Sequence, residues 1–367
     1  MTAVAYSYGT WRSHAKGSIT WADLQPTQGS YAGTGSDQAA MVLNWTTFDS
    51  IMAEADSVGV GICWNMYRTP PWASIPGDQV GGSNTVVGAW GDAGESAVPA
   101  KLQYLTDIVT KVLQRANAGR KRIIYVEPLN EPEFYDSTAL AAYIAASGKP
   151  FWTGTPSQAV DYVWTVRQAV KAFDSTIPVL MPGQYSTPRI DSFLTATGSA
   201  SSKKGWETFD YLNIHPYTAA PNQALGGNDL YYVTGVTAGI AVAQRSLAAA
   251  GCPTTKLVAA TEWGLSTTPN SVVTAFNTGT SASRFTYLTR LFAMAALDGI
   301  PLFIPFTYLA SPASNSLAGD FTNDTAGCIA AMTDVNTKLA GKTIVSGGYY
   351  PDGSVTVQLL GGSVYTW

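Results

Sequence analysis

Charged residues, cysteine and histidine are all scarce in this sequence, and each scarcity excludes something. Only 13% of the 367 residues are charged, and 25 acidic against 21 basic residues with no basic run predict no nucleic-acid partner. The cysteines Cys63, Cys252 and Cys328 lie far apart without a C-x-x-C pair, which favours neither a disulfide framework nor a zinc site. A metal site normally needs several convergent ligands, and with only 2 histidines we expect no metal and no cofactor.

Long apolar runs are absent as well. No run of about 18 apolar residues is present, so we expect no membrane span. The first residues, Met1-Thr-Ala-Val-Ala-Tyr, lack the basic region and apolar stretch of a signal peptide. Little lysine with much serine, threonine, alanine and glycine is typical of an exported enzyme, so composition alone favours an extracellular or particle-borne location. The oligomeric state stays open.

Aromatic and apolar residues are abundant. The chain is 46% hydrophobic, which is enough for a large core, and it holds 11 tryptophans and 19 tyrosines. The C–H faces of sugar rings pack well on such flat side chains, so a polysaccharide or oligosaccharide is the expected partner. The alternative for about half of these rings is ordinary core packing.

Short β-rich runs alternate with helical patterns through most of the chain, which indicates βαβ units around a parallel sheet. This predicts an α/β fold, a TIM-type (β/α)8 barrel. A barrel needs eight strands, and seven runs are convincing. Ala3–Tyr8 and Ile19–Leu24 could supply the first two strands, but their separation is short for a parallel crossover, so either the first unit is abbreviated or an N-terminal strand is missing. The strand-like runs are Ala5–Trp11, Val58–Tyr67, Arg122–Pro128, Ile177–Pro182, Phe209–His215, Leu257–Glu262 and Pro301–Tyr308. The helical patterns are Trp45–Ser57, Lys101–Ala118, Pro156–Phe173, Val236–Ala250, Ser281–Asp298 and Thr325–Leu339.

The end of the chain changes character. Lys342-Thr-Ile-Val and Ser354-Val-Thr-Val-Gln-Leu-Leu are β-rich, and Pro351-Asp-Gly between them is turn chemistry. We therefore expect a barrel over 1–340 and, over 341–367, a small antiparallel β appendage packed on it.

Two glutamates stand at the ends of strand-like runs. Glu131 follows Ile123-Ile-Tyr-Val-Glu-Pro-Leu-Asn, and Glu262 closes Leu257-Val-Ala-Ala-Thr-Glu. Barrel enzymes assemble their active sites at the carboxyl ends of the strands, and glycosidic bond cleavage generally uses two carboxyl groups. The alternative for either residue alone is a helix-capping or surface glutamate.

These motifs resemble those of the clan A glycoside hydrolases, which carry Asn-Glu-Pro after the fourth barrel strand and a second glutamate after the seventh. Asp210-Tyr-Leu-Asn-Ile-His-Pro-Tyr looks like the sixth strand of that clan. Within it, the sequence is most similar to family thirty-nine, especially its exopolysaccharide endoglycosidase branch. The stretches that carry this likeness are Trp21-Ala-Asp-Leu-Gln-Pro, Gly29-Ser-Tyr, Trp45 with Phe48-Asp49, Arg68-Thr-Pro-Pro-Trp-Ala-Ser, and Tyr308 with Asn315-Ser-Leu-Ala-Gly.

The resemblance implies a retaining hydrolase in which Glu131 is the general acid/base and Glu262 the nucleophile. It further implies that Asn130 binds the substrate 2-hydroxyl, and that Arg12 and Tyr217 hold Glu262 ionised and oriented. A turn-forming role for Asn130 and a structural ion pair for Arg12 are the alternatives. The family pattern is broken after Arg12, where His14 and Ala15 replace an aromatic and an acid.

Further residues are candidates for substrate contact. His215 is expected to line the sugar pocket by hydrogen bonding, with a buried core histidine as the alternative. Aromatic rings at or after strand ends are candidate sugar platforms, with packing at the barrel rim as the alternative: Trp64, Trp72, Trp263 and Tyr308. Of the rival acids, Glu127 is expected to point into the barrel mouth toward Arg12, and Glu133, which follows a proline, to face solvent.

Other functions remain open at this point. The same fold without catalysis would be a carbohydrate-binding barrel, which the intact Glu131 and Glu262 argue against. A metal-dependent hydrolase would require clustered histidine and aspartate, and an aldolase would require a lysine at a strand end. Neither feature is visible in the sequence. Among glycosidases, endo action on a bacterial exopolysaccharide competes with exo action of the β-xylosidase kind, and the loops at 74–99 and 219–228 suit either.

Overall fold

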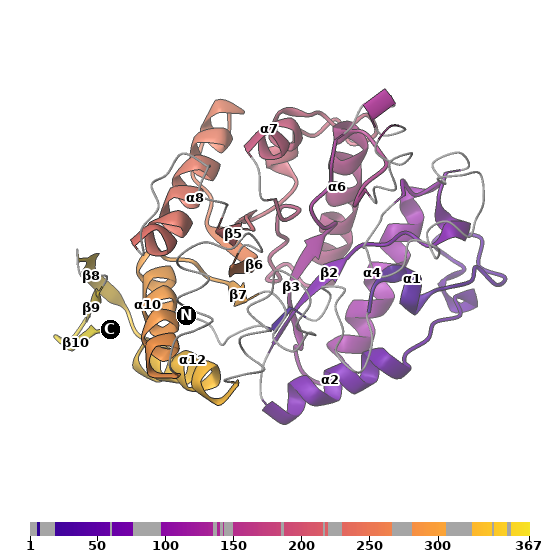
Figure 1. The fold of residues 1–367 in the computed structure, drawn as a ribbon. Helices are drawn as coiled ribbons and strands as arrows, with labels where there is room; N and C mark the ends of the chain where they lie inside the picture. The colour runs from indigo at the N-terminus through magenta and orange to yellow at the C-terminus, as the bar shows by residue number, and fades with distance from the viewer. Residues whose placement is uncertain are drawn as a thin grey trace. The chain divides into compact units, whose positions relative to one another are not determined.

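The computed structural model describes most of the chain (Figure 1): residues 6–7, 19–58, 61–75, 97–134, 138–139, 142, 150–184, 187–215, 217–218, 230–265, 281–305, 325–339, 341–350 and 354–367. Contacts within the chain divide it into two compact units. The first unit comprises 6–213 and 244–256, and the second is built mainly from 214–243 and 257–367.

The first unit contains a parallel sheet whose strands follow chain order. Strand β1 (Tyr6–Ser7) pairs with β2 (Ile62–Met66), which pairs with β3 (Ile123–Pro128). Parallel bridges continue the sheet from Val126 to Val179 and from Leu180 to Tyr211, next to β4 (Leu212–Asn213). All five residues of β2 are buried. Burial of this kind is typical of a parallel strand covered on both faces.

Helices α2 (Thr46–Val58), α4 (Leu102–Ala116) and α6 (Pro156–Phe173) fall where the apolar periodicity predicts them. The buried stripe of α4 is Leu105, Ile108, Val109, Val112 and Leu113 with a few neighbours, and α4 packs against α6. Thr155 begins α6 with a capping box to Gln158, and a proline occupies the first helical position. The unit also holds α7 (Thr187–Thr195), which the sequence pattern did not reveal, and the short 3-10 segments η1 (Gln38–Ala40), η2 (Pro71–Ala73) and η4 (Gly205–Glu207).

The proposal of a strand at Ile19–Leu24 is wrong. Residues Trp21–Leu24 form helix α1, which Thr20 caps by accepting the Asp23 N–H while the Asp23 side chain accepts the Thr20 N–H. Two apolar residues of this turn, Trp21 and Leu24, are buried, and their separation of three places them on one face of a helical turn. The capping box therefore decided the local structure.

The second unit also contains parallel strands with helices between them. Strand β6 (Val258–Leu265) pairs with β5 (Tyr217–Thr218) and with β7 (Phe303–Pro305). The Ile214 N–H donates to the Ala259 carbonyl, which extends the pairing ahead of β5. This unit contains α8 (Leu230–Ala249) up to Ala243, together with α10 (Ser281–Leu297) and α12 (Thr325–Leu339), and α10 packs against α12.

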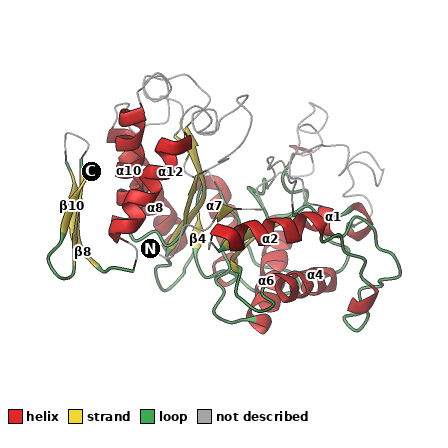
Figure 2. Cartoon of the chain, turned by 90° about the horizontal axis from the view of Figure 1, so that it is seen from below, coloured by secondary structure: helices red, strands yellow, loops and turns green. Residues whose placement is uncertain are grey.

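The C-terminal segment forms the antiparallel sheet that its turn chemistry predicts (Figure 2). Strand β9 (Val355–Leu359) lies between β8 (Ile344–Tyr349) and β10 (Val364–Thr366). Alternate residues of β9 are buried, namely Val355, Val357 and Leu359, and they join a core cluster with α10 and α12. The boundary between 340 and 341 stays a prediction.

Within each unit the described strands β1–β7 pair in parallel, as a (β/α) barrel requires, but the described strands are partial and do not close a barrel. Of the residues that the structure describes, no helix is both long and apolar enough to span a membrane.

Candidate active site

The turn that follows β3 carries Asn130 and Glu131 in an uncommon backbone conformation. Leu129 has φ 65° and Glu131 has φ 38°, values in the left-handed region that residues other than glycine rarely adopt. Neighbouring strands hold the turn: the Leu129 N–H donates to Met66 O at 2.9 Å, and the Glu131 N–H donates to Gly183 O at 3.1 Å. Such strain costs about 1–3 kcal/mol per residue and persists where surrounding contacts over-determine it, which is common at functional sites. The half-buried Glu131 is thus set at the carboxyl end of β3.

Asn130 has a side chain that is suited to a ligand. It is 1% exposed, and neither its amide nitrogen nor its amide oxygen has a hydrogen-bond partner among the described residues. A buried amide without partners costs free energy, so each such group calls for an explanation. A sugar hydroxyl, which donates and accepts, is the kind of group that satisfies it.

Glu127 is a structural member of the same strand. Its side chain is fully buried, and Oε1 accepts the Gly183 N–H at 3.1 Å and the Asn213 side-chain amide at 2.9 Å. Glu127 therefore links β3 to Gly183 and to Asn213 of β4. Its expected partner Arg12 lies outside the described residues. Asn213 was missed as a site residue, although the sequence placed it on a strand with His215.

The expectation that Glu133 faces solvent is wrong. Its side chain is 5% exposed, Oε2 accepts the Phe151 N–H at 2.6 Å, and Oε1 lies 3.8 Å from Nη2 of Arg189 on α7. Burial raises the pKa of Glu133 from 4.5 to about 7; Arg189 and the Phe151 N–H oppose this rise, and the charge of Glu131 adds to it. The groups that cover Glu133 come from segments distant in sequence, so no local pattern could reveal them.

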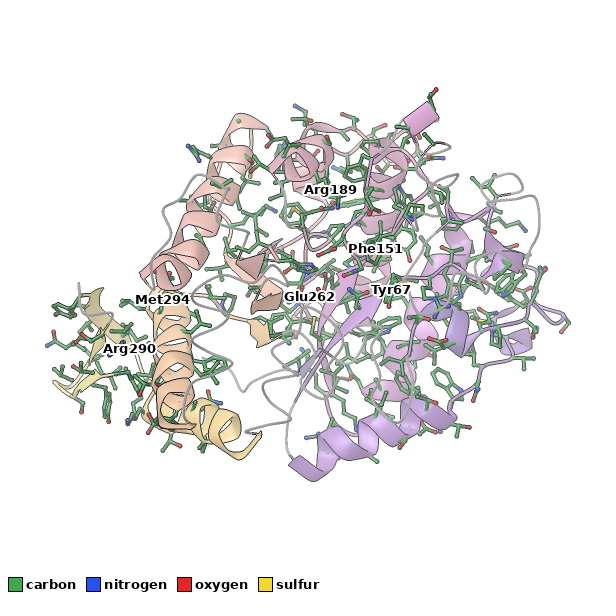
Figure 3. All side chains as sticks on the ribbon, in the orientation of Figure 1. Tyr67, Phe151, Arg189, Glu262, Arg290 and Met294 are labelled. Carbon is green, nitrogen blue, oxygen red and sulfur yellow. The ribbon has the colours of Figure 1, made fainter. Side chains whose placement is uncertain are left out.

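In the second unit, Glu262 and His215 lie side by side. Glu262 is 2% exposed within β6, and its Oε2 is 3.6 Å from Nδ1 of His215, which is 1% exposed (Glu262 is labelled in Figure 3). The other ring nitrogen of His215 lies 3.0 Å from the Thr261 hydroxyl. A histidine this close to a carboxylate favours the ionised carboxylate when the histidine is protonated. Histidine and carboxylate are also metal ligands, so the absence of a metal stays a prediction.

Two of the tryptophans predicted as sugar platforms, Trp64 and Trp72, differ in their surroundings. Trp64 is fully buried and donates Nε1–H to Ile19 O at 3.2 Å, so it belongs to the core, and its assignment as a sugar platform is corrected. Trp72 is half-buried and donates Nε1–H to Gln25 O at 2.9 Å. Its ring packs edge-on in an aromatic cluster with Trp21, Tyr31 and Tyr104. A role for Trp72 in sugar binding stays a prediction.

The side chains of the other four candidates lie outside the described part of the structure. Arg12 and Tyr308 lie outside the described residues. Tyr217 and Trp263 belong to β5 and β6 by their backbone, where Tyr217 pairs with Gly264 and Trp263 with Pro305, but their side chains are not described.

Comparisons with known proteins bear on the fold. No protein-family model and no curated protein sequence matches the chain. Among solved structures, it is similar to a glucosidase from Croceicoccus marinus, with 15% identity and a TM-score of 0.55 over 92% of this chain and 64% of that chain. It is also similar to a GH30 endoxylanase from Clostridium papyrosolvens C71, with 12% identity and a TM-score of 0.50 over 86% of this chain and 66% of that one.

At these identities the likeness concerns the fold. It supports a fold shared with these two enzymes, of which the described strands show only part. It spans just under two thirds of the length of these two relatives.

Proposed function

We propose that this chain is a retaining glycoside hydrolase with Glu131 as general acid/base and Glu262 as nucleophile. The observation that carries the proposal is the setting of these two glutamates. One stands on a strained turn at the carboxyl end of a parallel strand, next to the Asn130 amide, which has no hydrogen-bond partner among the described residues, and the other is buried in a parallel strand beside a histidine. The fold shared with glycosidases supports it.

The chemistry is a double displacement. The Glu262 carboxylate attacks the anomeric carbon while Glu131 protonates the departing oxygen, which leaves a glycosyl ester on Glu262. Glu131 then removes a proton from water, the water oxygen attacks the same carbon, and the Glu262 carboxylate departs. Two inversions give net retention. Asn130 binds the 2-hydroxyl, and His215 keeps Glu262 oriented.

For the substrate, we propose internal cleavage of a bacterial exopolysaccharide, on the resemblance to family thirty-nine. The wealth of tryptophan and tyrosine supports a carbohydrate partner. Digestion of a panel of bacterial exopolysaccharides and plant glycans tests this, with product size and anomer read by chromatography and NMR. Release of single sugars from chain ends would favour exo action of the β-xylosidase kind instead.

Chemical rescue tests the nucleophile. Glu262→Ala should abolish hydrolysis of an activated aryl glycoside, and added azide should restore turnover by occupying the vacated space. The product should be a glycosyl azide of opposite anomeric configuration to the substrate. Glu207→Ala, which removes a partly buried carboxylate in η4, serves as control and should keep full activity. Wild-type activity in Glu262→Ala would refute the assignment.

A further inference from the structure

The segment after β3 carries a second buried carboxyl, Glu133, which the chemistry above does not use. It is separated from Glu131 by Pro132 alone. Its Oε2 accepts the Phe151 N–H at 2.6 Å, and Arg189 on α7 lies 3.8 Å from the other oxygen (Phe151 and Arg189 are labelled in Figure 3). A buried carboxyl next to a candidate acid has either a structural or a chemical reason to be there.

The partner of this hydrogen bond is itself firmly held. Trp152, the next residue after Phe151, is 1% exposed and packs edge-on against Tyr162 of α6, with ring centroids 5.7 Å apart. Its indole N–H donates to the carbonyl of Thr155 at 3.3 Å, and Thr155 caps α6. The Phe151 N–H is therefore fixed relative to the start of α6.

The turn that bears Glu131 is held by hydrogen bonds to neighbouring segments. Its left-handed residues, Leu129 and Glu131, relax to other conformations unless contacts prevent it. Two ties come from one neighbouring strand: the Glu131 N–H donates to Gly183 O at 3.1 Å, and the Gln184 side-chain amide donates to Pro132 O at 3.0 Å. The third contact is the hydrogen bond of Glu133 to the Phe151 N–H, and Phe151 precedes α6 in the chain. The three hydrogen bonds therefore hold Glu131 and the two residues that follow it.

We propose that Glu133 is a positioning residue for Glu131, whose hydrogen bond to the Phe151 N–H fixes the turn on which Glu131 stands. This inference rests on the proposed function, because it requires Glu131 to be the acid. The charge of Glu131 contributes to raising the pKa of Glu133, so the two carboxyl groups interact across the turn. Proton transfer to a leaving oxygen tolerates little displacement, and a shift near 1 Å costs about 100-fold in rate.

The test compares two leaving groups on the same sugar. Acid catalysis matters for an alkyl glycoside and hardly at all for a 2,4-dinitrophenyl glycoside, whose leaving group departs without a proton. Glu133→Ala should lower kcat/KM for the alkyl glycoside about 10- to 100-fold and for the dinitrophenyl glycoside by less than about threefold. Glu133→Gln keeps an oxygen that accepts the Phe151 N–H, and it should restore most of the alkyl glycoside activity.

Glu131→Ala and Glu207→Gln are measured in parallel. Glu131→Ala should show the same selectivity for the better leaving group, more strongly, and Glu207→Gln should resemble wild type. Equal slowing of both substrates in Glu133→Ala, no slowing of either, or no recovery in Glu133→Gln would overturn the positioning role while leaving the proposed function intact. A Glu131→Ala variant without leaving-group selectivity would overturn the acid assignment and this inference with it.

Discussion

Glu133 makes the stability of the fold depend on pH in a direction that is unusual for a glutamate. Its pKa is about 7 in the folded protein, against 4.5 for an ordinary glutamate. Since the folded state binds this proton more tightly, the stabilisation is fully present below about pH 4.5 and is lost as pH rises through about 7. A pKa unit corresponds to about 1.4 kcal/mol, so the full loss is on the order of 3 kcal/mol. A carboxyl group whose pKa is lowered by folding has the opposite effect, because it makes the folded state more stable as pH rises. A loss of stability with rising pH is therefore the expected sign for Glu133.

The measurement is urea denaturation of wild type and Glu133→Gln between about pH 5 and pH 8. The glutamine cannot ionise, and its side-chain oxygen can accept the Phe151 N–H that Glu133 accepts. The free energy of unfolding of Glu133→Gln relative to wild type should therefore rise by about 2–3 kcal/mol over this range. Glu207→Gln should give a curve parallel to that of wild type. Parallel curves for Glu133→Gln and wild type would refute the reasoning, because they would mean that Glu133 titrates alike in the folded and unfolded chains.

Other contacts give further predictions of stability. Buried Asp107 accepts the Tyr31 hydroxyl and two glutamine side-chain amides, so Asp107→Ala leaves these donors unpaired and should cost about 3 kcal/mol in urea unfolding. A cost under about 1 kcal/mol would contradict this. The Trp367 indole donates to Asp334 on α12 at 2.7 Å, so Trp367→Ala should cost about 2 kcal/mol by the same measurement. Leu360→Ala, at a side chain 72% exposed, should change stability by less than about 0.5 kcal/mol, and equal effects of the two substitutions would contradict a specific role for Trp367.

The sequence predicts helices better than it predicts short strands in this chain. Helix α6 is found at its predicted bounds because a capping box, a proline at the first position and an apolar stripe all agree there. At Ile19–Leu24, where a strand is the prediction, the capping box of Thr20 and Asp23 instead begins the helical turn Trp21–Leu24. Helix α7 is short, and its amphipathic pattern spans too few turns to stand out.

Some features of the candidate site could be predicted from the sequence and others could not. Glu131 follows β3 closely, as the sequence predicts, whereas Glu262, predicted to close a strand, lies within β6, which continues to Leu265. The burial of Glu133 could not be predicted, because the groups that cover it, Phe151 and Arg189, are 18 residues or more away in the chain. Trp64 illustrates the reverse error: position near a strand end does not say which way a ring points, and this one points into the core.

Trapping the covalent intermediate tests the central claim most directly. A 2-deoxy-2-fluoro glycoside with a dinitrophenyl leaving group slows both steps but leaves formation of the ester faster than its hydrolysis, so the glycosyl-enzyme should accumulate. Intact-protein mass spectrometry should then show the gain of one fluoroglycosyl group, and peptide mapping should place it on Glu262. Labelling of another residue, or turnover of matched unfluorinated substrates with inversion and no labelling, would contradict the account.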